Sequence, residues 1–168
     1  MSDGYQILAD VDAGEDEAEP LGAAARSWLN AAGVVEPAGA PGPRYADAVL
    51  EASPAPLATR PNGLEVVTGR TVFHGDGTGR VACPGCSEAA DWDWLSEAIG
   101  DWDAGGDGRR TCPACGRPLG LNDWGWEPAW AFGFLGLRFW NWPPLRPAFV
   151  AEVGRRLGHR IVLVAGRL

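Results

Sequence analysis

The chain has 168 residues, a length that suits one domain, and 46% of them are apolar, which is enough for a hydrophobic core and excludes wholesale disorder. The net charge of −8 argues against broad nucleic-acid binding, because such affinity comes mainly from neutralising phosphates. No run approaches the ~18 uninterrupted apolar residues of a membrane span, and the N-terminus has no basic or apolar stretch, so we expect a cytoplasmic protein without a secretory signal.

The N-terminal third predicts a strand, a helix and then an irregular segment. Residues 5–11 alternate loosely between apolar and polar side chains, which favours a strand. Apolar residues at helical spacing predict a helix over about 20–32, which begins at Pro20 and ends before Gly33. Residues 36–63 contain six prolines and three glycines, so we expect a Pro/Gly-rich connecting stretch with at most one short element.

Two further strand regions flank the middle of the chain. Residues 64–68 and 70–74 are β-rich runs divided by Gly69, which indicates either a hairpin or a bulged strand. The long apolar run 130–140, with its glycines and aromatic residues, favours a buried strand over a helix.

The C-terminal segment repeats the pattern of the N-terminal one. An apolar face predicts a helix over about 145–157, which Gly158 ends, and residues 161–165 predict the last strand. We therefore predict an α+β fold, a single sandwich of a mainly antiparallel sheet with two helices. A ferredoxin-like arrangement is one form of such a sandwich. The alternative is two unrelated halves joined by the Pro-rich stretch.

Four cysteines carry the sharpest chemical signal. Cys83 and Cys86 form one C-P-x-C turn, and Cys112 and Cys115 form a second one, with 25 residues between the two. Each turn presents two thiolates, and two such turns that face each other make the tetrahedral sulfur site that suits Zn²⁺. Four cysteines leave no coordination position open for water, so we expect the Zn²⁺ to be structural.

The two turns resemble those of the zinc-ribbon family, over about residues 81–117 and no further. The resemblance implies a structural zinc supported by a β-hairpin, and no activity. Ser87 departs from the family pattern, which usually has glycine at that position. We predict one α+β domain over 1–168 with a zinc-ribbon insert at about 81–117. Iron stays an alternative metal, since rubredoxin-like proteins also use paired C-x-x-C turns.

The segment between the two turns, residues 91–108, is rich in aspartate and tryptophan. We interpret it as an acidic, solvated excursion whose tryptophans fold back over the metal site. Eight of the nine tryptophans lie between positions 92 and 142. They either supply bulk to a small glycine-rich core or form a surface patch that binds a partner protein. The predicted patch consists of Trp124, Trp126, Trp140, Trp142, Arg138 and Arg146.

No catalytic motif accompanies these features. Neither His74 nor His159 belongs to a motif that pairs it with a nucleophile, and there is no phosphate-binding or dinucleotide-binding loop. The leading hypothesis is a non-enzymatic, zinc-stabilised protein-binding module of the bacterial cytoplasm, such as an inhibitor or adaptor. One alternative is a nucleic-acid-binding regulator that uses the zinc ribbon and the Arg-rich residues 109–168. The other is a rubredoxin-like iron electron carrier.

Overall fold

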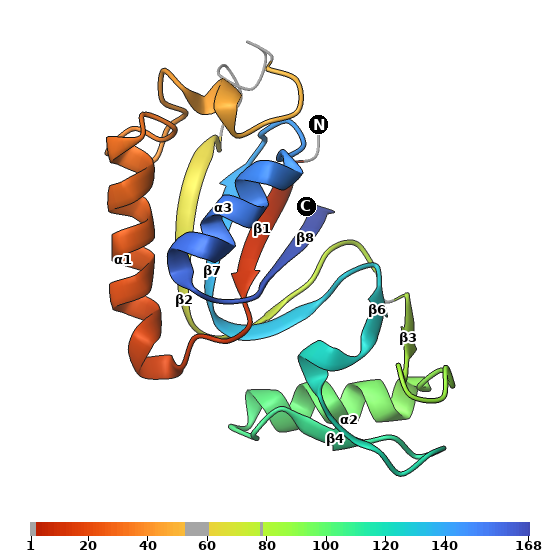
Figure 1. The fold of residues 1–168 in the computed structure, drawn as a ribbon. Helices are drawn as coiled ribbons and strands as arrows, with labels where there is room; N and C mark the ends of the chain where they lie inside the picture. The colour runs from red at the N-terminus through yellow and green to blue at the C-terminus, as the bar shows by residue number, and fades with distance from the viewer. Residues whose placement is uncertain (1–2, 53–60, 78) are drawn as a thin grey trace.

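The main part of the molecule is a four-stranded antiparallel sheet (Figure 1). The computed structural model describes residues 3–52, 61–77 and 79–168. The sheet has the order β2-β7-β1-β8. Its strands are β1 (Gly4–Asp10), β2 (Gly63–Phe73), β7 (Ala131–Trp140) and β8 (Ile161–Arg167). The predicted mainly antiparallel α+β fold is confirmed.

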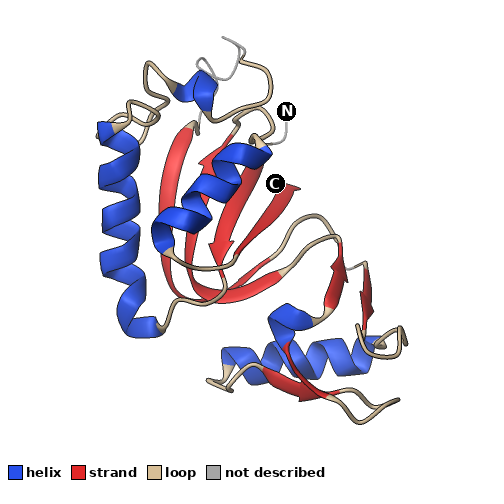
Figure 2. Cartoon of the chain, viewed as in Figure 1, coloured by secondary structure: helices blue, strands red, loops and turns tan. Residues whose placement is uncertain are grey.

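Two helices cover one face of this sheet (Figure 2). They are α1 (Glu15–Ala31) and α3 (Pro147–Leu157). The six elements follow each other as β1-α1-β2-β7-α3-β8, which is the β-α-β-β-α-β connectivity of ferredoxin-like folds. In the described residues, every other regular element, apart from one short turn of helix, is inserted between β2 and β7.

Helix α1 begins earlier than the sequence pattern predicts. It starts at Glu15, five residues before Pro20, because the Glu17 carboxylate accepts a hydrogen bond from the Gly14 N–H at 2.9 Å. Glu15, Asp16 and Glu17 therefore lie in the first turn of the helix, where its dipole favours negative charge.

The core between the helices and the sheet is apolar and closed. Leu137 and Phe139 of β7 and Leu8 of β1 are buried against α1 and α3. Burial of each such side chain contributes roughly 1.5–3 kcal/mol. On the opposite face, Phe73 lies over Gly136, where a side chain of any size would collide with its ring. Strand β2 is continuous but shifts register between Thr68 and Thr71, so the bulged-strand interpretation is the correct one.

The Pro/Gly-rich stretch is described only in part, since residues 53–60 of it lie outside the described ranges. Its described part contains one short 3-10 helix, Tyr45–Asp47, and an antiparallel bridge between Val35 and Pro41. Val49 is buried and bridges to Leu145, which attaches this stretch to the sandwich. No helix in the described residues is long and apolar enough to span a membrane.

The insert between β2 and β7 forms a separate lobe at one end of the sheet, here called the cysteine lobe (residues 80–127; lower right in Figure 1). It contains two two-stranded sheets, β3–β6 and β4–β5, and the helix α2 (Trp92–Asp103). Its strands are β3 (Arg80–Ala82), β4 (Arg109–Thr111), β5 (Pro118–Gly120) and β6 (Gly125–Glu127). The pairing of β3 with β6 closes the lobe at its base.

Helix α2 corrects the prediction of a solvated excursion. Its N-cap is Asp91, whose side chain accepts a hydrogen bond from the Trp94 N–H at 2.8 Å. Leu95, Ala98 and Trp102, at helical spacing, are buried. The acidic residues occupy the outer side of an amphipathic helix.

Three polar side chains form hydrogen bonds or ion pairs between the cysteine lobe and the main sheet. Arg70 of β2 donates to the carbonyls of Trp102 and Gly106, and its guanidinium lies 4.3 Å from the Trp102 ring centre. Asn122 bonds both the N–H and the C=O of Phe132. Arg160, just before β8, forms ion pairs with both Asp12 and Asp123. These contacts join the lobe to β2, β7 and β8.

Candidate metal centre

The two cysteine turns have the same local structure. In the first turn, the Ser87 N–H donates to the Cys83 carbonyl at 2.8 Å, and the Cys83 N–H donates to the Glu88 carbonyl at 2.9 Å. The second turn repeats both bonds at 2.9 Å with Cys112, Gly116 and Arg117 in the corresponding places. The residue after each pair has positive φ.

Short strands hold these turns in position. β3 leads directly into Cys83, and a bridge between Ala82 and Ala89 closes the first turn. The hairpin β4–β5 carries the second turn at its tip. This arrangement fits the β-hairpin support that the zinc-ribbon resemblance implies.

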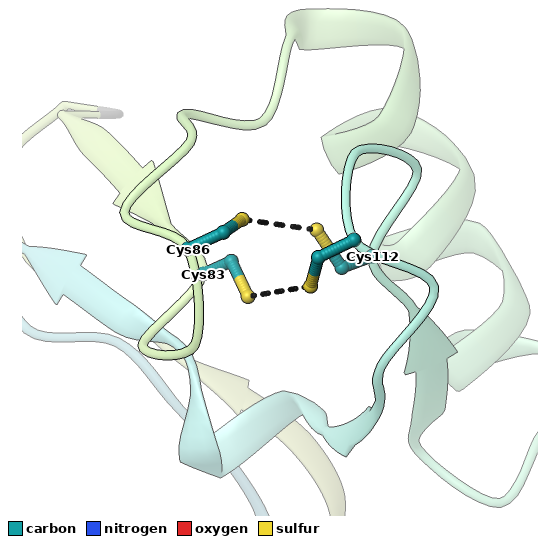
Figure 3. A group of neighbouring side chains, drawn as sticks. Cys83, Cys86 and Cys112 are labelled. Atoms are coloured by element: carbon teal, nitrogen blue, oxygen red, sulfur yellow. Dashed lines mark hydrogen bonds between the residues drawn. The ribbon is translucent and has the colours of Figure 1, made fainter.

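The four sulfur atoms converge on one point (Figure 3). All four Sγ atoms lie within 4.8 Å of one another. The Cys83 and Cys115 Sγ atoms are 3.8 Å apart, as are those of Cys86 and Cys112. A disulfide needs about 2.05 Å between sulfurs, so the four thiols are free. The cluster can hold a metal ion, as the spacing of the cysteines predicts.

The centre lies half inside the lobe. Cys83 and Cys112 are buried in an apolar cluster with Leu95 and Trp124, whereas Cys86 and Cys115 are exposed. The Trp94 and Trp124 rings, 4.3 Å apart between centres, belong to the same cluster. The prediction that tryptophans of the intervening segment fold over the metal site is thus confirmed for Trp94.

Hydrogen bonds prepare the first turn for a thiolate. Burial raises the pKa of the Cys83 thiol. Hydrogen bonds from the N–H groups of Gly85 and Cys86 and from the thiols of Cys112 and Cys115 lower it by more, so that the pKa falls to about 7. The Gly85 N–H lies 3.3 Å from the Cys83 Sγ. For Cys86, the Glu88 N–H lowers the pKa, but burial and the neighbouring thiols raise it to about 12.

Arginines surround the first turn. The Arg117 guanidinium lies against Gly85, where a Cβ atom would come within 2.9 Å of Cζ. Arg80 donates from Nη2 to the Ser87 carbonyl at 3.1 Å. Four thiolates on a divalent ion carry a net negative charge, which these two guanidinium groups would partly balance.

The residues predicted to bind a partner do not form one surface. Trp124 is 4% exposed, beside the cysteines, and Trp142 is 7% exposed, packed on Tyr45 and Phe139 in the main core. The two tryptophans belong to separate clusters. The prediction of a patch that contains both is wrong, because their large apolar rings fill two different cores.

The other four predicted residues lie on three parts of the molecule. Trp126 is half-buried and stacks on Trp130 at 5.6 Å. Trp140 and Arg138 are half-buried on the sheet face away from the helices, and each bonds the Glu65 carboxylate. Arg146 is exposed beside α3 and donates to the Val49 carbonyl.

Sequence reasoning missed an apolar groove between α3 and β8. The groove has a volume of about 730 Å³, and Val150, Ile161 and Leu163 contribute to its walls. His159 lies at one end, with Nδ1 2.8 Å from the Asp10 carboxylate. The sequence signals are the apolar residues of a final strand and a histidine after a helix-ending glycine, and neither reveals that they border one groove.

Comparison of the chain with protein-family models, with curated proteins and with solved structures returns no match, so only the geometry bears on its function.

Proposed function

We propose that this chain is a non-enzymatic, zinc-stabilised protein-binding module that acts as an inhibitor or adaptor. The convergence of four cysteine sulfurs within 4.8 Å carries the zinc part of the proposal. With Zn–S bonds of about 2.3 Å, the sulfurs of a regular tetrahedron are about 3.8 Å apart. The distances across the two turns, 3.8 Å each, match this value.

A structural role for the metal follows from the ligand set. Four thiolates complete the coordination of Zn²⁺, whereas catalytic zinc sites have three protein ligands and an open position. The metal would fix two turns to each other in a lobe whose strands have only three residues each. Because such short strands supply little stability by themselves, the lobe depends on the metal. Free thiols also suit a reducing compartment such as the cytoplasm.

The histidines support a non-catalytic role. His159 bonds Asp10, and His74 contacts the Gly75 carbonyl through Nδ1. Across residues 3–52, 61–77 and 79–168, neither ring has a hydrogen bond to a serine, threonine or cysteine. A serine, threonine or cysteine nucleophile that is activated by histidine needs such a pair.

The groove between α3 and β8 supports the protein-binding part of the proposal. Its walls are largely apolar, it is open along one side, and Leu163 within it is 38% exposed. A partner segment with apolar side chains would bury this exposed apolar surface, and this favours protein binding.

Metal analysis tests the zinc centre. We expect one equivalent of zinc per chain and a colourless protein after expression in medium that contains both zinc and iron. The variant with Cys83→Ser and Cys112→Ser should bind no metal and lose the cooperative unfolding of the cysteine lobe. A coloured protein with iron in the site would favour the electron carrier, and a double variant whose lobe still unfolds cooperatively would contradict a structural metal.

Electrophoretic mobility shifts separate protein binding from nucleic-acid binding. At low salt, we expect no shift of duplex DNA or single-stranded RNA. A shift that weakens steeply with salt would favour the regulator hypothesis.

A further inference from the structure

Strand β8 is an edge of the main sheet, and its outer backbone groups are open. The Arg160 C=O and the Leu168 N–H bond residues at the two ends of β1, so the even-numbered residues of β8 face β1. The Arg167 N–H points the other way, to the Asp76 carboxylate at 2.9 Å. The odd-numbered residues Ile161 and Leu163 therefore direct their N–H and C=O groups outward, where no described residue bonds them.

A loop covers the far end of this edge. Gly75 lies against the Ala165 carbonyl, so closely that a Cβ atom on it would come within 1.9 Å of that oxygen. With Asp76 on the Arg167 N–H, the loop blocks the last residues of β8. The open edge is thus short, from Ile161 to the N–H of Ala165. Its N–H and C=O groups suit a strand that pairs with β8 and stops at the loop.

The apolar groove lies directly beside this open edge. Ile161 and Leu163 project their side chains into it, opposite Val150 and Ala151 of α3. A strand paired with β8 would direct every second side chain toward the groove, because side chains alternate between the two faces of a sheet. Apolar side chains at those positions would bury Leu163.

The groove carries excess positive charge beside the C-terminal half of α3, whereas at Arg160 two carboxylates, Asp12 and Asp123, pair with one guanidinium group. Arg155 lines the groove, and the Glu152 carboxylate that pairs with Arg155 also pairs with Arg156. One carboxylate thus serves two guanidinium groups. Arg146, at the other end of α3, is exposed and donates to a backbone carbonyl. A carboxylate on the bound strand would be favoured at either end of α3.

We propose that the open edge of β8 binds an extended segment of a partner protein, with apolar residues at alternate positions and at least one acidic residue. The inference rests on the proposed protein-binding function and names its site. In the register centred on Leu163, a second copy of this chain fits less well than a foreign strand, since Ile161 would face an Ala165 whose carbonyl the Gly75 loop covers. A strand from another protein would meet only one Gly75 loop, and its pairing with β8 can end before that loop.

The probe is a random library of 12-residue peptides on phage, selected on the full-length, zinc-loaded protein. We expect enriched sequences that alternate apolar residues and contain an aspartate or glutamate. N-methylation of a synthetic peptide at successive residues should weaken binding at every second position, because only those N–H groups would bond β8. By NMR, amide exchange at Ile161, Leu163 and Ala165 should slow when the peptide binds, while amides at 162 and 164 should already be slow.

Two variants place the site on the protein. Leu163→Asp should weaken binding about tenfold or more, and Arg155→Glu should weaken it several-fold and relax the preference for acidic peptides. The matched control is Arg44→Glu, since Arg44 is exposed and pairs with Asp47 three residues away, as Arg155 pairs with Glu152. It should leave affinity unchanged, and circular dichroism should show every variant folded.

Three other outcomes would overturn the proposal that the open edge of β8 binds a partner strand. Peptides that bind both groove variants as tightly as the wild type would leave protein binding intact and refute the β8 site alone. A selection without any binder would count against both proposals. Protection of the Ile161 and Leu163 amides that rises with protein concentration, without peptide, would mean that a second copy occupies the edge.

Discussion

Ser87 and Gly116 occupy the same position in the two cysteine turns, and both have positive φ, 63° and 72°. For a residue with a side chain, this backbone conformation costs about 1–2 kcal/mol of conformational free energy, whereas glycine adopts it without this cost. The serine that departs from the zinc-ribbon pattern therefore adopts the conformation for which the family uses glycine.

Replacement of Ser87 by glycine should stabilise the first turn by up to about 1 kcal/mol. The reciprocal change, Gly116→Ala, should destabilise the second turn by about 1–2 kcal/mol. A Cβ atom at position 116 meets no atom within 4 Å, so its effect is purely conformational. Urea unfolding of the zinc-loaded protein measures both, and a stabilising Gly116→Ala would show that the turns are not equivalent.

Trp124 should be essential to the metal centre, whereas Trp92 should not. Trp124 packs against Cys83, Cys112 and Trp94, so Trp124→Ala should cost about 3–5 kcal/mol and weaken zinc retention against a chelator. Trp92 is 63% exposed on α2, so Trp92→Ala should change the unfolding free energy by less than about 0.5 kcal/mol. Equal losses in the two variants would contradict the burial of Trp124 beside the cysteines.

The cluster of four cysteines and most of the main sheet are predictable because their signals are local. The C-P-x-C spacing identifies the four cysteines that converge. The apolar runs 130–140 and 161–165 predict β7 and β8, and the helical spacing of residues 145–157 predicts α3. Helix α2 also has local signals, Asp91 as N-cap and apolar residues at helical spacing, but its many acidic residues hide them.

The features that sequence reasoning missed depend on distant residues. Trp124 and Trp126 are two residues apart, but only the fold decides that one is buried beside Cys83 and the other is stacked on Trp130. The Asp10–His159 pair joins residues 149 positions apart, and no local pattern connects them. The groove exists because β8 is last in the sheet order.

Two glycine substitutions should have opposite effects on stability. A Cβ atom on Gly136 would lie 2.6 Å from the Phe73 Cε1 atom and 3.0 Å from the Ile7 Cγ2 atom, so Gly136→Ala should cost about 1–3 kcal/mol through overpacking. Gly100 is exposed in α2, and a Cβ atom on it would have no other atom within 4 Å, so Gly100→Ala should add about 0.5–1 kcal/mol. Thermal unfolding followed by circular dichroism measures both, and tolerance of Gly136→Ala would refute the close packing of Phe73.

The Asp10–His159 pair should make the unfolding free energy depend on pH. Asp10 is fully buried, and its Oδ1 accepts hydrogen bonds from the N–H groups of Asp12 and Ala13. Its Oδ2 lies 2.8 Å from the His159 Nδ1, and this hydrogen bond raises the pKa of His159 above 6.5, although burial opposes the shift. A histidine whose pKa is higher in the folded than in the unfolded protein stabilises the fold below the unfolded pKa, and this contribution is lost as pH rises through the folded pKa.

Urea unfolding at a series of pH values from about 5.5 to about 8.5 tests this relationship. The wild-type protein should lose unfolding free energy as the pH increases across the interval that begins near 6.5, while His159→Gln should lose less in that interval. The control is Asp10→Asn, because an asparagine Oδ1 can still accept from Asp12 and Ala13 while the charge facing His159 is gone. Both variants should show a reduced dependence, and the reduction should be larger in His159→Gln, because Glu17 and Asp12 still raise the pKa of His159 in Asp10→Asn. A wild-type slope that persists unchanged in His159→Gln would assign the pH dependence to other groups.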